Sequence, residues 1–198
     1  MSTTSVDSRA ADGATVQRAD ARRNRAKVLL AAREQFAREG LDAQMDDIAR
    51  AAGVGVGTVY RHFPTKEDLI RALADARFEA FAAAGKRSLE LADPWAGLVQ
   101  FLSDCARVIA DDVAISEAME QRPGLCHEAA MAVDMRGITG QVVERAKASG
   151  QLRPDIDAED IPSLMRGLGS AVHSNQGPAP MSWECYLEIL LAGIRARG

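Results

Sequence analysis

The sequence lacks the features that mark several large classes of protein. No apolar run approaches the roughly 18–20 residues that a membrane span needs, and residues 1–20 contain no apolar stretch of the kind found in secretory signals. The three cysteines, Cys105, Cys126 and Cys185, are too few and too widely spaced for a disulfide framework and fit a reducing compartment. The sequence therefore predicts a cytoplasmic protein that does not enter a membrane.

Motifs of catalysis and of metal binding are also missing. The chain has no glycine-rich phosphate loop, no nucleophile motif and no HExxH pair of zinc ligands. The histidines and cysteines after residue 100 are scattered, whereas a metal site needs clustered ligands. We therefore expect no enzyme activity, no cofactor and no metal. A redox-sensing thiol at Cys126, which lies close to Arg122, is the alternative role for a cysteine.

Strand-like alternation of β-branched residues is absent, so the predicted fold class is all-α. Residues 1–20 hold almost no large apolar side chains and predict a flexible tail. Apolar residues at helical spacing begin after Ala21, and Gly40 is a typical stop signal for that helix. Further helices are expected over residues 45–52, 57–62, 65–92, 94–111, 114–121, 127–148, 157–174 and 182–195.

Charge is unevenly distributed along the 198 residues, whose length suits one large domain or two small ones. The net charge of the chain is −4, yet residues 18–71 contain 11 Lys and Arg against 8 Asp and Glu. Residues 72–198 are acidic. This asymmetry favours a polyanionic partner for the N-terminal third alone.

The most informative segment is MDDIARAAGVGVGTVYRHFPTK, residues 45–66. Two short helices joined by a tight turn at Gly53 form a helix-turn-helix plan. Ile48, Val59 and Phe63 are placed to pack the two helices against a core. The positions left facing outward carry hydrogen-bonding side chains, and in this plan the second helix enters the major groove of DNA. Those positions are Thr58, Tyr60, Arg61 and His62, with Gly57 permitting close approach and Lys66 opening the next helix.

In these residues the chain resembles the N-terminal DNA-binding domain of the TetR family of bacterial transcriptional regulators. The matching positions, within residues 28–70, are Ala31, Ala32, Phe36, Gly40, Ile48, Ala49, Ala52, Gly53, Val54, Thr58, Val59, Tyr60, Phe63 and Lys66. The resemblance implies a homodimer of nine-helix subunits that binds a palindromic operator and is released by a small-molecule effector in the C-terminal domain. It divides the chain into the tail of residues 1–20, a DNA-binding domain over 21–66 and an effector-binding and dimerisation domain over 67–198.

The same resemblance assigns roles to single residues. Thr58 and Tyr60 become contacts to phosphates or bases, and His62 and Lys66 become phosphate contacts. The sequence departs from the family where many members have a Ser or Thr ahead of the first short helix, because Gln44 stands there. The expected DNA-binding set is Gln44, Gly57, Thr58, Tyr60, Arg61, His62 and Lys66. The alternative is that Tyr60 packs within its own domain and that His62 and Lys66 are solvated surface charges.

Four arginines near the start of the first helix have two interpretations. Arg18, Arg22, Arg23 and Arg25 form either an ordinary solvated face or a basic arm that reaches the DNA backbone or minor groove.

Apolar stripes at helical spacing run along the last two helices. They predict either the core of one subunit or, as the resemblance implies, a two-fold four-helix dimer interface. The expected interface residues are Leu164, Leu168, Val172, Leu187, Leu190, Leu191 and Ile194.

Aromatic residues and methionines of the larger domain are candidates for an effector pocket, which would then favour an apolar or aromatic ligand. The candidates are Phe78, Phe81, Trp95, Phe101, Met119, Met131, Met165 and His173, with Met135 and His127 as further lining residues. The alternative is that these side chains form ordinary core.

The predicted function is that of a ligand-responsive repressor, with double-stranded DNA, a small molecule and a second copy of the chain as partners. Two alternatives stand beside it. The first is a DNA-binding protein of the same fold that takes no effector and lacks an enclosed cavity. The second is a helical carrier protein whose basic domain no longer binds DNA.

Overall fold

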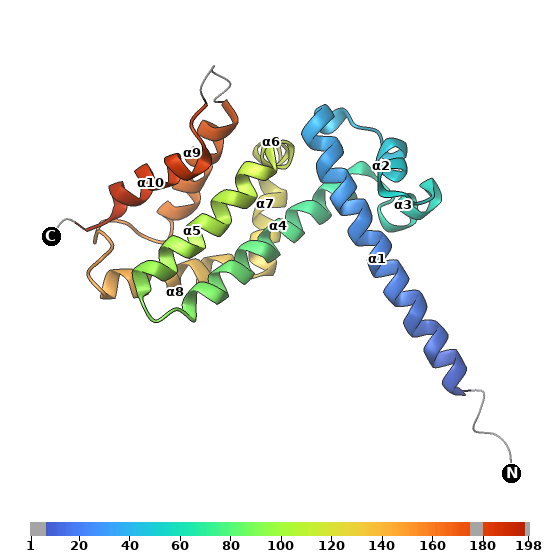
Figure 1. Ribbon diagram of the computed structural model, residues 1–198, viewed down its shortest axis with the longest axis horizontal. Coiled ribbons are helices and arrows are strands. Elements are labelled where there is room, and N and C mark those ends of the chain that lie inside the picture. The colour runs from blue at the N-terminus through green and yellow to red at the C-terminus, as the bar shows by residue number, and fades with distance from the viewer. Residues whose placement is uncertain (1–6, 175–179, 197–198) are drawn as a thin grey trace, which may run out of the picture. The chain divides into compact units, whose positions relative to one another are not determined.

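The computed structural model describes residues 7–174 and 180–196, which form ten α-helices and one short 3₁₀ helix (Figure 1). The helices are α1 (Asp7–Glu39), η1 (Gly40–Asp42), α2 (Met45–Ala52), α3 (Val56–His62), α4 (Lys66–Leu89), α5 (Pro94–Asp111), α6 (Val113–Gln121), α7 (Pro123–Ala132), α8 (Met135–Ala148), α9 (Asp160–Ser174) and α10 (Trp183–Ile194). The expected all-α class is confirmed. In the described part of the chain, β-type pairing is limited to one isolated bridge between Leu152 and Arg195. None of the described helices combines the length and apolar character that crossing a membrane requires.

The chain divides into two compact units, Met1–Ala72 and Leu73–Gly198. The expected boundary lay between residues 66 and 67, but α4 begins at Lys66 and continues through the division without a break. Its start was predicted correctly. The Thr65 and Asp68 side chains bond each other's backbone N–H groups, at 3.0 Å to Asp68 Oδ2 and 3.1 Å to Thr65 Oγ1, which is a capping box.

The first unit is built on α1, against which α2 and α3 pack. Its core contains Val28, Phe36, Ile48, Val59 and Phe63, each at most 2% exposed. The predicted flexible tail over residues 1–20 is wrong for residues 7–20, because α1 already begins at Asp7. Residues 1–6 lie outside the described part. Four of the residues between 7 and 20 are alanine, which has the highest helix propensity and favours a helix even without large apolar residues to bury.

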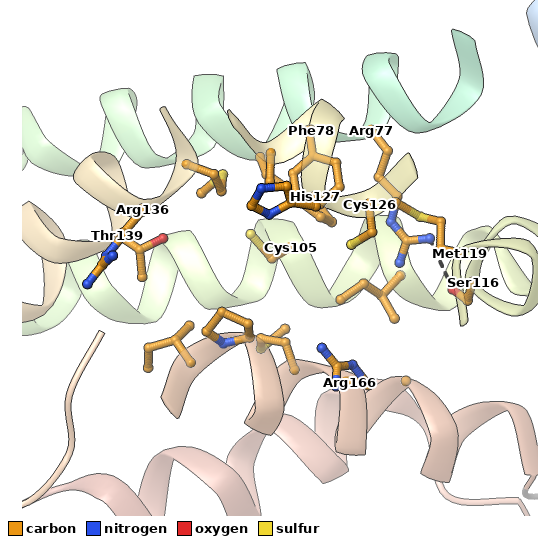
Figure 2. Close-up of a pocket in the computed structure, with 18 of the residues that line it drawn as sticks. Arg77, Phe78, Cys105, Ser116, Met119, Cys126, His127, Arg136, Thr139 and Arg166 are labelled. Carbon is orange, nitrogen blue, oxygen red and sulfur yellow. Dashed lines mark hydrogen bonds between the residues drawn. The ribbon is translucent and has the colours of Figure 1, made fainter. Parts of the chain in front are cut away.

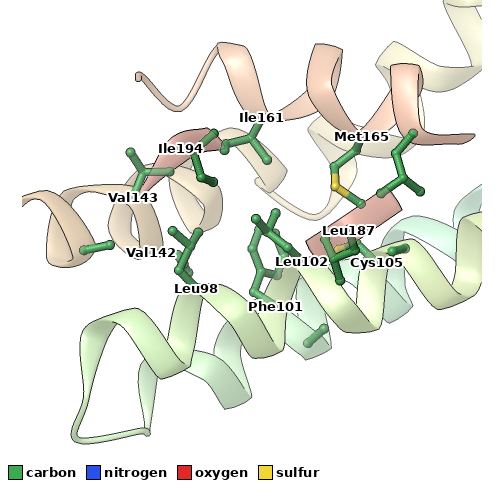
Figure 3. Close-up of a cluster of buried hydrophobic side chains, with 14 of the residues drawn as sticks. Leu98, Phe101, Leu102, Cys105, Val142, Val143, Ile161, Met165, Leu187 and Ile194 are labelled. Carbon is green, nitrogen blue, oxygen red and sulfur yellow. The ribbon is translucent and has the colours of Figure 1, made fainter. Parts of the chain in front are cut away.

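The second unit is arranged around α5, which contacts α8, α9 and α10 (Figure 3). Leu98, Phe101 and Leu102 of α5 are at most 2% exposed and pack with residues of these three helices. Asp93 caps α5, because its Oδ1 accepts a hydrogen bond of 2.9 Å from the Trp95 N–H.

Two helix boundaries in the second unit differ from the prediction. The helix expected to begin at residue 127 already begins at Pro123, which occupies the first turn of α7, where the missing N–H of proline costs nothing. The single helix expected over 127–148 is interrupted between α7 and α8. Asp134 there adopts φ 51°, in the left-handed region, and its side chain caps α8 by accepting a bond from the Gly137 N–H at 3.2 Å.

Candidate nucleic-acid interface and internal cavity

The helix-turn-helix of the first unit consists of α2 and α3 joined through Gly53. Gly53 has φ 64°, a left-handed conformation in which a side chain would be strained, and its N–H bonds the last carbonyls of α2. Gly55 precedes α3, and its carbonyl accepts a bond of 2.8 Å from the Thr58 N–H. The predicted turn is therefore confirmed at the residue that requires glycine.

Helix α3 has one buried side and one exposed side, as expected for an amphipathic helix with 3.6 residues per turn. Val59 is fully buried and Phe63, directly after the helix, is 2% exposed. Tyr60 is 45% exposed, Gly57 and Arg61 are exposed, and Thr58 is half-buried. The structure thus brings Gly57, Tyr60 and Arg61 together on the outer surface of the unit.

Lys66 and Gln44 already bind backbone carbonyls. The Lys66 Nζ donates a hydrogen bond of 2.9 Å to the Leu41 carbonyl, which ties the start of α4 to η1. The Gln44 side chain donates to the Asp42 carbonyl at 2.6 Å and does not cap α2. An ammonium has three donors, so the bond from Lys66 leaves capacity for a phosphate.

His62 is half-buried, and its Nε2 is turned inward, where it has no hydrogen-bond partner among the described residues. Only Nδ1 of this ring is therefore available for a contact outside the unit. Sequence reasoning missed Val56, which is 41% exposed at the start of α3 and one turn before Tyr60. Its spacing of four residues from Tyr60, which places both on one side of α3, is the sequence signal that was overlooked.

The second unit contains a partly open cavity of about 880 Å³ lined by α4, α5, α6, α7, α8 and α9 (Figure 2). Six of the eight predicted pocket residues line it: Phe78, Phe81, Phe101, Met119, Met165 and His173. His127 and Met135 line it as well. Trp95 and Met131 do not. Trp95 is buried, and the guanidinium carbon of Arg195 lies 5.1 Å from the centroid of the Trp95 ring. Met131 is 65% exposed.

Apart from His127 and His173, the polar groups of the cavity wall were not predicted from the sequence. Arg77 is 5% exposed, donates a bond of 3.0 Å to the Ser116 hydroxyl and lies 5.6 Å from the Phe81 ring centroid. Thr139 is 5% exposed and lies, with Arg136, toward the opposite end of the cavity from Arg77 and Ser116 (Figure 2). Arg77 interrupts the apolar spacing of α4 four residues after Leu73, and this interruption is the sequence signal for it.

Cys105 and Cys126 also line the cavity. Burial is the main reason that the pKa of Cys105 is raised to about 12 and that the pKa of Cys126 is raised. Both thiols are therefore protonated near neutral pH and are weak nucleophiles. No group of three or more potential metal ligands occurs in the part of the chain that the structure describes.

The stripes expected to pair subunits are mostly part of this subunit's own core. Leu168, Leu187 and Ile194 are at most 5% exposed within the single subunit, which favours the alternative that they form its core, and their place in an interface stays a prediction. The remaining four pack partly buried against the same core: Leu164, Val172, Leu190 and Leu191. Sequence periodicity could not distinguish core residues from interface residues, because both positions select apolar side chains.

A helix-turn-helix with an exposed polar face on its second helix is the form in which many proteins read double-stranded DNA. The N-terminal model of the TetR family of bacterial regulatory proteins matches residues 28–73. The model of the C-terminal domain of SbtR-like transcriptional regulators matches residues 93–196. The chain belongs to the TetR family and is a helix-turn-helix transcriptional regulator.

Individual relatives agree with this assignment. A TetR regulatory protein from Mycobacterium vanbaalenii is 34% identical, with TM-score 0.67 over 91% of this chain and 99% of that one. The HTH-type transcriptional regulator SrpR of Pseudomonas putida is 27% identical over 76% of this chain and 73% of its own length. The HTH-type transcriptional repressor LfrR of Mycolicibacterium smegmatis is 43% identical over 34% of this chain and 40% of its length. These relatives are transcriptional regulators rather than enzymes.

Proposed function

We propose that this regulator is a repressor that binds a palindromic operator as a homodimer and leaves it when a small molecule enters the cavity of the second unit. The observation that carries the proposal is the exposed face of α3. Gly57, Tyr60 and Arg61 lie outward while Val59 and Phe63 hold the helix to its core. The name of LfrR as a repressor supports the direction of regulation.

In the proposed complex α3 enters the major groove. Tyr60 and Arg61 contact bases or phosphates, and Thr58, His62, Lys66 and Gln44 contact the backbone. Val56 adds an apolar contact of the kind that recognises a thymine methyl group. Gly57 allows the helix to approach the DNA closely.

The dimer is required because a palindromic operator presents two equivalent half-sites. The outer surface of α10 supports it. Ile189 is 61% exposed there, and Cys185 and Ala192, one turn to either side, are exposed too. We place the proposed contact with a second copy around this exposed apolar side chain.

The cavity supports an effector and argues against the alternative of a regulator without one. Its volume of about 880 Å³ lies within the range of small-molecule sites. Phe78, Phe81 and Phe101 favour an apolar or aromatic ligand, and polar wall groups such as Thr139 would orient it. Because α4 carries both Lys66 in its first turn and Phe78 in the cavity wall, it gives a direct route from ligand to DNA-binding unit.

The test uses a duplex selected from a random DNA library by the full-length protein. Tyr60→Ala should weaken binding to that duplex by about 1–3 kcal/mol, measured by gel shift at fixed salt, because the variant removes a side chain from the groove. Leu91→Ala is the matched control, since Leu91 is 40% exposed in the other unit. Equal affinity of the Tyr60 variant and the control would contradict the docking of α3.

A further inference from the structure

The N-terminal half of α1 extends beyond the part of the helix that packs on the first unit's core (Figure 1). Val28 is the first fully buried residue of this helix among those whose side chains are described, and residues 17–27 are exposed or half-exposed. The extension therefore offers most of its side chains to a partner.

One face of this extension is basic. Arg18, Arg22 and Arg25 are followed by Leu29, Ala32 and Phe36 at alternating intervals of four and three residues. Residues so spaced share one side of a helix. The same side that packs on the core through Ala32 and Phe36 thus becomes a basic stripe toward the N-terminus. We call Arg18, Arg22 and Arg25 the α1 stripe.

The α1 stripe borders the recognition helix. The Arg25 guanidinium carbon lies 5.5 Å from the centroid of the Phe63 ring, and Phe63 directly follows α3. Arg18 and Arg22 continue from Arg25 along the helix over about 10 Å, at a rise of about 1.5 Å per residue. The stripe therefore starts beside the C-terminal end of α3.

The other cations of this segment lie on the opposite side. Arg23 and Lys27 are four residues apart and about half a turn away from the stripe. Arg23 forms an ion pair with Asp20. Arg18 and Arg22 are exposed and make no hydrogen bond or ion pair within the described part of the chain. Of the four arginines that the sequence analysis treated together, Arg18, Arg22 and Arg25 thus share one side of α1, and Arg23 lies on the other side, paired with Asp20.

We propose that Arg18 and Arg22 bind phosphates of the DNA that flanks each half-site, so that α1 extends the contact beyond the groove read by α3. Three like charges on one exposed face repel each other and gain from an anionic partner, and each DNA strand presents a phosphate about every 3.4 Å. The contact is to the backbone and adds affinity without sequence preference. It deepens the proposed function and rests on the DNA-facing position of α3.

The test measures how the logarithm of the binding constant changes with the logarithm of salt concentration, using the full-length protein. The slope of R18Q/R22Q should be shallower than that of the wild type by up to about 0.9 for each phosphate that the variant no longer neutralises. R23Q/K27Q is the matched control because it removes the same charge from the other side of the same helix. Glutamine keeps the helix propensity of the replaced residues, which circular dichroism verifies.

The slope is measured on the selected duplex and on a random-sequence duplex. A shallower slope for R18Q/R22Q alone supports the inference. An equal reduction in both double variants, or none in R18Q/R22Q, would overturn it. If the wild type selects no sequence but the random duplex still shows the difference, the proposed operator function fails while the α1 stripe stands.

Discussion

Burial separates the three cysteines at the scale of single residues. Cys105 is buried, Cys126 is half-buried and Cys185 is exposed. Since burial raises the pKa of Cys105 to about 12 and also raises that of Cys126, both thiols are held in the protonated form. The thiolate is the reactive species, so the idea of Cys126 as a redox sensor finds no support in its surroundings.

Alkylation with iodoacetamide at pH 8, at a protein concentration low enough to dissociate the proposed dimer, should therefore modify Cys185 and leave Cys105 unmodified in the folded subunit. A thiol with a pKa of about 12 is ionised at pH 8 in only about one molecule in 10⁴. Mass mapping of the alkylated peptides measures this, and the unfolded chain, which should react at all three positions, is the control. Modification of Cys105 as fast as of Cys185 would show that the second unit opens readily.

At the scale of the helices, the sequence predicted the turns and helix ends that depend on the residues close to them in the chain. The turn at Gly53 and the first residues of α4 and α5, to within one residue, were found from residue type and spacing. The start of α1 and the break before α8 were missed. An exposed helix carries no apolar period, and the left-handed Asp134 is a conformation that its residue type does not announce.

The candidate site was likewise predictable only where local sequence decides the structure. The outward face of α3 was predictable because the buried Val59 and Phe63 set its phase. The cavity was only partly predictable, since a cavity wall and a solid core use the same aromatic residues. Phe101 and Trp95 lie on one helix, but only Phe101 faces the cavity.

Contact between helices gives a test at this scale. An added Cβ at Gly85 of α4 would overlap the Cγ2 of Ile138 in α8, whereas a Cβ at Gly140 would meet nothing within 4 Å. Gly85→Ala should lower the free energy of unfolding by about 1–3 kcal/mol through overpacking. Gly140→Ala should raise it by about 0.4–1 kcal/mol because the unfolded chain loses freedom. Urea unfolding measures both, and a stabilised Gly85 variant would contradict the close packing of α4 on α8.

At the scale of the whole molecule, periodicity alone could not say whether a stripe is core or interface. Leu187 and Ile194 proved to be core, and the exposed Ile189 is the better candidate for contact between subunits. This distinction depends on how α10 packs against α5 and α9, which no local pattern encodes.

Ile189→Arg should convert the proposed dimer into monomers, because a charge would be buried at the centre of the contact. Sedimentation at equal protein concentration measures the change. Leu30→Arg is the matched control, since Leu30 is also 61% exposed on a helix but lies in the first unit. A dimer that survives Ile189→Arg would exclude this surface of α10 as the interface.

Sequence-specific recognition of DNA is the central claim, and a gel-shift titration tests it most directly. The full-length protein is titrated against the DNA upstream of its own gene and against the library-selected duplex, at fixed salt and with nonspecific competitor. We expect a discrete complex that survives competitor on at least one of these DNAs, with a palindrome in the selected sequence. Dissociation of every complex by competitor, with no sequence enriched from the library, would contradict the claim.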